Sequence, residues 1–140
     1  MAAPLPRFPD WRARLSSYLI ECASRDMAWG EHDCALFIAG GVLAQTGHDF
    51  AAPFRGKYKT ERGAAKALIR YGAGTLADTV AAALPEIDPA QARQGDICLF
   101  DQPDGLTCGI VLRANIAAVT ATGLTHVSKD RIVRAFRVGE

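Results

Sequence analysis

The chain has 140 residues, and its 16 Lys and Arg against 15 Asp and Glu give a formal net charge of +1. The two kinds of charge are interspersed, which argues against nucleic acid or an anionic membrane as a partner. No apolar run reaches bilayer-spanning length, so no membrane span is expected. Hydrophobic residues make up 49% of the chain, enough for one core. We expect a single domain over residues 1–140, with residues 1–9 as an extended arm.

Helical patterns fill the first half of the chain. Apolar spacing and stop signals predict four helices, over residues 9–25, 33–46, 60–71 and 75–84. Asp33, Thr60 and Thr75 are suited to cap the last three. From Cys34 to Ala44 every residue is apolar or glycine. Because a helix that is apolar all round is buried, we expect the second helix to form the centre of the core.

Short strand patterns follow in the second half. Five strands are predicted, over residues 97–100, 106–112, 116–120, 124–127 and 132–138. Residues 97–100 lack alternation, so this strand should be covered on both faces. The expected fold is therefore α+β, with N-terminal helices packed on a C-terminal antiparallel sheet of about five short strands.

The four cysteines are Cys22, Cys34, Cys98 and Cys108. No two of them have the C-x-x-C spacing of a zinc or redox site, so neither a metal nor a cofactor is expected. Cysteines within apolar stretches are typically buried and reduced in a protein made in a cytosol.

One cysteine has a more specific setting, in the segment Trp29-Gly30-Glu31-His32-Asp33-Cys34. Here the thiol lies in the first turn of the buried helix, where unpaired N–H groups and the helix dipole favour thiolate over thiol. The same N–H groups could stabilise an oxyanion. Cys34 is therefore a candidate nucleophile, and a neutral histidine beside it would complete the activation.

Three segments together resemble a known family: Asp33-Cys34 at the start of an apolar helix, Gly95-Asp96-Ile97-Cys98-Leu99-Phe100, and Cys108-Gly109-Ile110-Val111-Leu112. In this order they resemble the NlpC-type cell-wall cysteine peptidases, over roughly residues 26–138. The resemblance implies a papain-like fold and peptidoglycan stem peptides as substrates. The chain is also similar to small phage and prophage proteins that share the Trp-Gly-x-His-Asp-Cys opening. That similarity implies a component of the virion tail tip, with other tail-tip or hub proteins as partners.

The chain departs from the NlpC pattern at the catalytic base. The family's histidine begins the second strand, and that position here falls at Thr107, which cannot act as a base at neutral pH. Two other histidines could substitute. His32 could fold back over the thiol or could hydrogen-bond the loop, and His126 could approach from the fourth strand. His48 follows the far end of the helix, about 20 Å away, and is excluded.

Three functions remain open. The first is a cysteine hydrolase of peptidoglycan, which requires an open cleft at Cys34 and a histidine within reach. The second, which we favour, is a catalytically silent tail-tip subunit with a degenerate site. The third is an amidase or acyltransferase that acts on a small molecule, which the fold permits.

Overall fold

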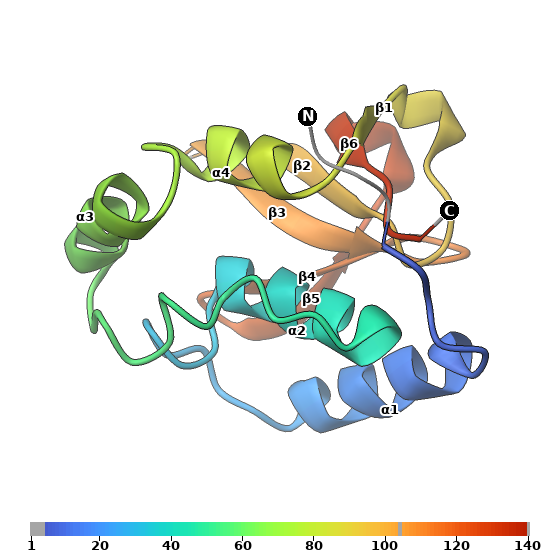
Figure 1. The fold of residues 1–140 in the computed structure, drawn as a ribbon, viewed down its shortest axis with the longest axis horizontal. Coiled ribbons are helices and arrows are strands. Elements are labelled where there is room, and N and C mark those ends of the chain that lie inside the picture. Colours follow the sequence, from blue (N-terminus) through green and yellow to red (C-terminus); the bar gives the residue numbers. More distant parts are fainter. Residues whose placement is uncertain (1–4, 104, 140) are drawn as a thin grey trace.

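The computed structural model describes residues 5–103 and 105–139 (Figure 1). The described chain contains four helices, α1 (Trp11–Ala23), α2 (Cys34–Thr46), α3 (Glu61–Tyr71) and α4 (Leu76–Ala83). It also contains six strands, β1 (Glu86–Ile87), β2 (Ile97–Gln102), β3 (Gly105–Val111), β4 (Ile116–Thr120), β5 (Gly123–Val127) and β6 (Ile132–Phe136). The α+β class and the four helices are thus confirmed.

The strands form one antiparallel sheet in the order β1-β6-β2-β3-β4-β5. Helix α2 packs against β3 and β4, and α1 packs on the other side of α2 (Figure 1). The sheet has six strands where about five were expected. The additional strand, Glu86–Ile87, pairs with β6 and is too short to give an alternating pattern in the sequence.

Helix α2 forms the centre of the core, as its apolar sequence predicted. Phe37 is fully buried, and the side chain of Asp33 caps the helix by accepting a 3.0 Å hydrogen bond from the backbone N–H of Leu36. Gly47 ends the helix with a φ of 81°, in the left-handed region. A Cβ added at Gly41 would collide with the side chain of Ile110, so the absence of a side chain there lets α2 lie close to β3.

The central strand β2 is buried on both faces, which confirms the prediction from its lack of alternation. Ile97 and Leu99 belong to the main core beneath α2. Cys98 and Phe100 point to the opposite face and form a second apolar cluster with residues of β3 and β4. The two clusters thus cover the two faces of β2.

A buried carboxylate ties the N-terminal arm to the sheet. Asp96 is fully buried and accepts hydrogen bonds from the backbone N–H groups of Arg93, at 2.9 Å, and Val138, at 3.0 Å. The guanidinium groups of Arg7 and Arg137 lie 3.7 and 3.2 Å from its two oxygens. The arm is therefore fixed to the protein through Arg7, although residues 5–8 form no helix or strand.

Candidate functional site

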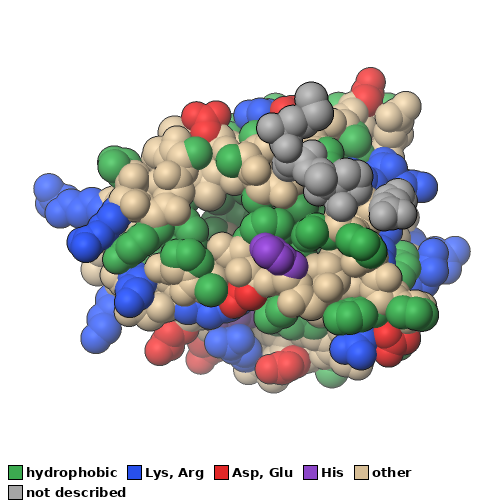
Figure 2. All heavy atoms as spheres, in the orientation of Figure 1, with side chains coloured by type: hydrophobic (Ala, Val, Ile, Leu, Met, Phe, Trp, Pro, Cys, Tyr) green, Lys and Arg blue, Asp and Glu red, His purple; other side chains and the backbone are tan. Residues whose placement is uncertain are grey.

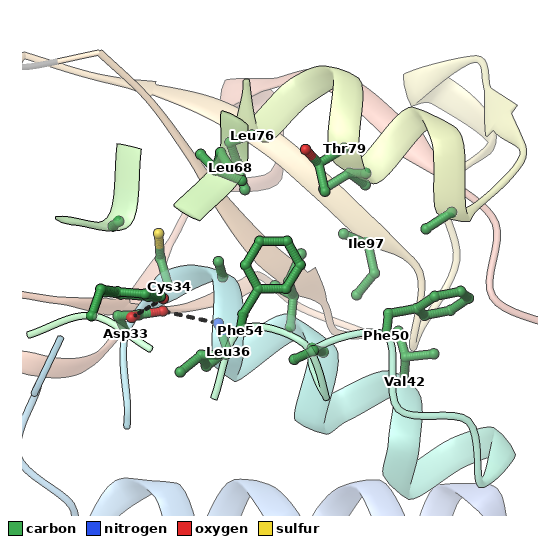
Figure 3. Close-up of a pocket in the computed structure, with 18 of the residues that line it drawn as sticks. Asp33, Cys34, Leu36, Val42, Phe50, Phe54, Leu68, Leu76, Thr79 and Ile97 are labelled. Carbon is green, nitrogen blue, oxygen red and sulfur yellow. Dashed lines mark hydrogen bonds between the residues drawn. The ribbon is translucent and has the colours of Figure 1, made fainter. Parts of the chain in front are cut away.

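Cys34 is the first residue of α2, and its side chain is half-buried. Its sulfur points into the space between α2 and the two following helices, α3 and α4 (Figure 3). That space is a cleft with a volume of about 290 Å³. The predicted nucleophile thus faces a cavity and not the packed core.

The cleft runs along one face of α2, on which Cys34, Ile38 and Val42 follow one another at intervals of four residues. Apolar side chains from the loop after α2 and from α3 and α4 form the opposite wall, among them Phe50, Phe54, Leu68, Leu76 and Val80. Figure 2 shows the hollow on this face of the molecule, with hydrophobic side chains around it. Trp29 lines the end nearest Cys34, and so it forms a wall of the cleft.

The thiol of Cys34 is unusually acidic, with a pKa lowered to about 7. The largest cause is a hydrogen bond from the thiol of Cys108, and the hydroxyl of Thr107 and the backbone N–H of Cys108 add to it. Burial and the negative charge of Asp33 act in the opposite direction. The pKa of Cys108 is raised well above its usual value by the same hydrogen bond and by burial. Of the two thiols, Cys34 is therefore the one that ionises at lower pH, and Cys108 is the donor that keeps its proton.

Asp33, beside the nucleophile, is fully engaged in local structure. Oδ2 accepts hydrogen bonds from the hydroxyl of Tyr58, at 2.6 Å, and from the backbone N–H of Gly30, at 3.0 Å. Oδ1 caps α2 through Leu36. Tyr58 lies between two exposed lysines, Lys57 and Lys59, but its own side chain is only 9% exposed. Burial of its ring, followed by its bond to Asp33, raises the pKa of Tyr58.

His32 lies on a different side of α2 from the cleft. It is only 2% exposed, its backbone pairs with that of Ala28, and its ring stands edge-on to Phe37 with the centroids 6.3 Å apart. It lines a separate groove between α1 and α2, together with Tyr18. Within the described residues its Nε2 atom has no hydrogen-bond partner. Burial lowers the pKa of His32, which favours the neutral imidazole, but its Nε2 atom makes no hydrogen bond to Cys34.

His126 is exposed on β5, opposite Ala117 of β4. Ala117 in turn pairs with Ile110 of β3. Two strand spacings of about 4.8 Å therefore separate His126 from β3, and Cys108 lies two residues further along that strand. Among the described residues, the structure thus gathers Thr107 and Cys108 around Cys34, and neither His32 nor His126 bonds to the thiol.

The hydroxyls near the end of β4 form a cluster of their own. The side chain of Thr120 lies 3.1 Å from the hydroxyls of both Thr122 and Thr125. None of the three residues lines the cleft. Cys108 is the member of the site that sequence reasoning missed, and its position directly after Thr107 was the available signal.

Residues 6–138 match the family described as "Domain of unknown function (DUF6950)". The chain belongs to this DUF6950 family. No curated protein matches the chain.

In the part of the DUF6950 chain that the structure describes, no helix is both long and apolar enough to cross a membrane. Nor do any three His, Cys, Asp or Glu side chains among residues 5–103 and 105–139 lie together as a metal site would require.

The chemistry open to this DUF6950 site follows from its nucleophile and its donors. The thiolate of Cys34 can attack an electrophilic carbonyl. Within the described residues, the N–H groups of Cys34 and Ala35 have no acceptor, since the N–H group of α2 that Asp33 caps is the later one, that of Leu36. They are free to bind an oxyanion. Cleavage of an amide also requires a proton for the leaving amine, and the neighbours Thr107 and Cys108 are poor acids at neutral pH.

Proposed function

We propose that this chain is an NlpC-like, papain-fold protein that has kept the nucleophile and lost the base, and that it serves as a structural subunit of a phage tail tip. One observation carries the degenerate site: Thr107, which the resemblance places at the family's histidine, brings a hydroxyl and no imidazole to Cys34 from β3. Its hydroxyl supports a thiolate but cannot exchange protons with a substrate.

The arrangement of the elements supports the papain-like assignment. A cysteine at the first position of a buried helix lies against β3, and β3 pairs with a strand preceded by Gly95-Asp96. The NlpC resemblance implies this same combination. Assembly with other tail-tip or hub proteins, and residence in the virion, rest on the similarity to small phage and prophage proteins.

Digestion of purified peptidoglycan tests the loss of hydrolysis. We expect no release of stem peptides by the unaltered chain, and no difference between it and the Cys34→Ala variant. A Thr107→His variant supplies an imidazole at the family's position and is the informative comparison. Robust digestion by the unaltered chain that disappears in Cys34→Ala would overturn the proposal.

The tail-tip role needs a separate test. In particles purified from a strain that encodes the chain, mass spectrometry should detect it in a constant ratio to the tail proteins. Complete particles without the chain would rule out a structural role in the virion.

A second candidate is an active cysteine peptidase or amidase that acts on peptidoglycan, with Cys34 as its nucleophile. The lowered pKa of Cys34 and the open cleft before its sulfur favour this function. This function requires a histidine that is not among the residues described in contact with Cys34. The digestion experiment above separates the two candidates.

A further inference from the structure

We propose that the cleft binds a linear aliphatic acyl chain and that Cys34 accepts the acyl group from a thioester. This inference goes beyond the structural role proposed above, and it rests on the premise that Cys34 keeps its nucleophilic thiol in a site without a base. It gives specific content to the acyltransferase alternative by naming the class of acyl donor and the space that holds its chain.

The chemistry of the walls selects an apolar occupant. Side chains such as Ile38, Val42, Leu68 and Leu76 surround the cleft, and within the described chain Asp33 and Glu61 are its only charged lining residues. Both oxygens of Asp33 are already bonded. A polar chain would lose its hydrogen bonds to water and find few partners on these walls, whereas an aliphatic chain gains by leaving water.

The length of the cleft indicates the length of the chain. Cys34, Ile38 and Val42 lie on one face of α2, and eight residues of helix extend about 12 Å. An extended chain advances about 3.3–3.6 Å for every three bonds. An acyl group of about ten carbons, attached at the sulfur of Cys34, would therefore reach Val42.

The reaction balances without a general base. The Cys34 thiolate attacks the thioester carbonyl, a new carbon–sulfur bond forms, and the carbonyl electrons move to oxygen, beside the N–H groups of Cys34 and Ala35. The oxyanion then collapses and expels the donor's sulfur as a thiolate, which takes a proton from water. No proton transfer is needed in the attack or the expulsion, because a thiolate enters and a thiolate leaves.

The same site disfavours the two steps that need proton transfer. An amide would require protonation of its leaving nitrogen, and hydrolysis of the acyl-cysteine would require activation of water. Among the described residues, Nε2 of His32 has no hydrogen-bond partner, and His126 lies on β5, two strands away from β3. The acyl group on Cys34 should consequently persist until another thiol removes it.

Two probes test the proposal: the decanoyl and acetyl thioesters of N-acetylcysteamine, incubated separately with the full chain at pH 7.5. Intact mass spectrometry follows the gain of one acyl group. Decanoyl loading should exceed acetyl loading at least about tenfold, because binding of the methylenes adds to the shared chemical step. Loading of both probes should fall to the background of the other cysteines in Cys34→Ala.

A variant that fills the cleft separates chain binding from thiol reactivity. Ala64→Phe, on the wall formed by α3, should lower the ratio of decanoyl to acetyl loading to near one. Ala82→Phe is the matched control, because Ala82 is exposed on α4 and does not line the cleft, and it should keep the preference.

Equal loading rates for the two probes, or a decanoyl preference that survives in Ala64→Phe, would overturn the acyl-chain proposal. Neither result would restore peptidoglycan digestion, so the proposed loss of hydrolysis would stand. Digestion of peptidoglycan by the unaltered chain would instead overturn the proposed loss of hydrolysis. The ratio of decanoyl to acetyl loading would still measure whether the cleft binds an acyl chain.

Discussion

The hydroxyl of Tyr58 donates a 2.6 Å hydrogen bond to Oδ2 of Asp33, the residue that precedes Cys34. This bond joins the loop after α2 to the start of α2 itself. The backbone supports the same connection, since the N–H of Gly56 donates to the carbonyl of Gly30 at 2.9 Å. The loop that forms one wall of the cleft is thus fixed to the turn that presents Cys34.

Removal of the Tyr58 hydroxyl should destabilise the protein. In Tyr58→Phe the carboxylate of Asp33 loses one of three partners inside a buried site, and we expect a loss of about 2 kcal/mol in the free energy of unfolding. Urea denaturation measures it. Tyr71→Phe is the control, because Tyr71 is 38% exposed. Equal stabilities of the two variants would show that the Tyr58 bond contributes nothing.

Neutralisation of Asp33 should make Cys34 more acidic. The negative charge of Asp33 opposes the thiolate, and asparagine retains the ability to cap a helix. The Asp33→Asn variant should therefore show a lower pH midpoint for alkylation of Cys34 than the unaltered chain. A higher midpoint would contradict this prediction. It would mean that the hydrogen bonds of the Asp33 carboxylate, which hold the turn before Cys34, stabilise the thiolate more than the negative charge destabilises it.

The two donors from β3 should have unequal effects on Cys34. The Cys108 thiol is the largest cause of the lowered pKa, and the Thr107 hydroxyl is a smaller one. Alkylation profiles should therefore move to higher pH in both Cys108→Ala and Thr107→Val, and further in Cys108→Ala. The assignment fails if Thr107→Val has the larger effect or if neither profile moves.

Much of the helical framework could be predicted because its signals are local. The caps Asp33, Thr60 and Thr75 each accept the predicted backbone hydrogen bond, and Gly47 ends α2 as expected. These features depend on residues within one turn of one another. The strands of the second half were also placed to within a few residues, since their turns carry glycine, proline and asparagine signals.

The site itself depends on contacts that no local pattern encodes. Tyr58 and Asp33 are 25 residues apart, and Cys34 meets Cys108 only because α2 lies across β3. The positions of His32 and His126 were equally undetermined, because a loop and an edge strand can direct a side chain to either side. The cleft arises from the way that α3 and α4 fold back, which apolar periodicity does not determine.

Loss of the Asp96 carboxylate should cost far more than loss of a surface ion pair. In Asp96→Ala the guanidinium groups of Arg7 and Arg137 lose a fully buried partner, and we expect a loss of about 3–5 kcal/mol in the free energy of unfolding. In the control, Glu86→Ala breaks an exposed 2.7 Å pair with Arg134 and should cost less than about 1 kcal/mol. Similar losses in both variants would contradict a structural role for Asp96.

The most direct test of an activated thiol is the rate of Cys34 alkylation by iodoacetamide as a function of pH, with the rate of Cys34→Ala subtracted. The folded protein should reach half its maximal rate near pH 7, below the value of about 8.5 for a free cysteine. A midpoint at or above 8.5, or a reaction that begins only when the protein is unfolded, would contradict the account of Cys34 as an accessible thiolate at the end of an apolar cleft.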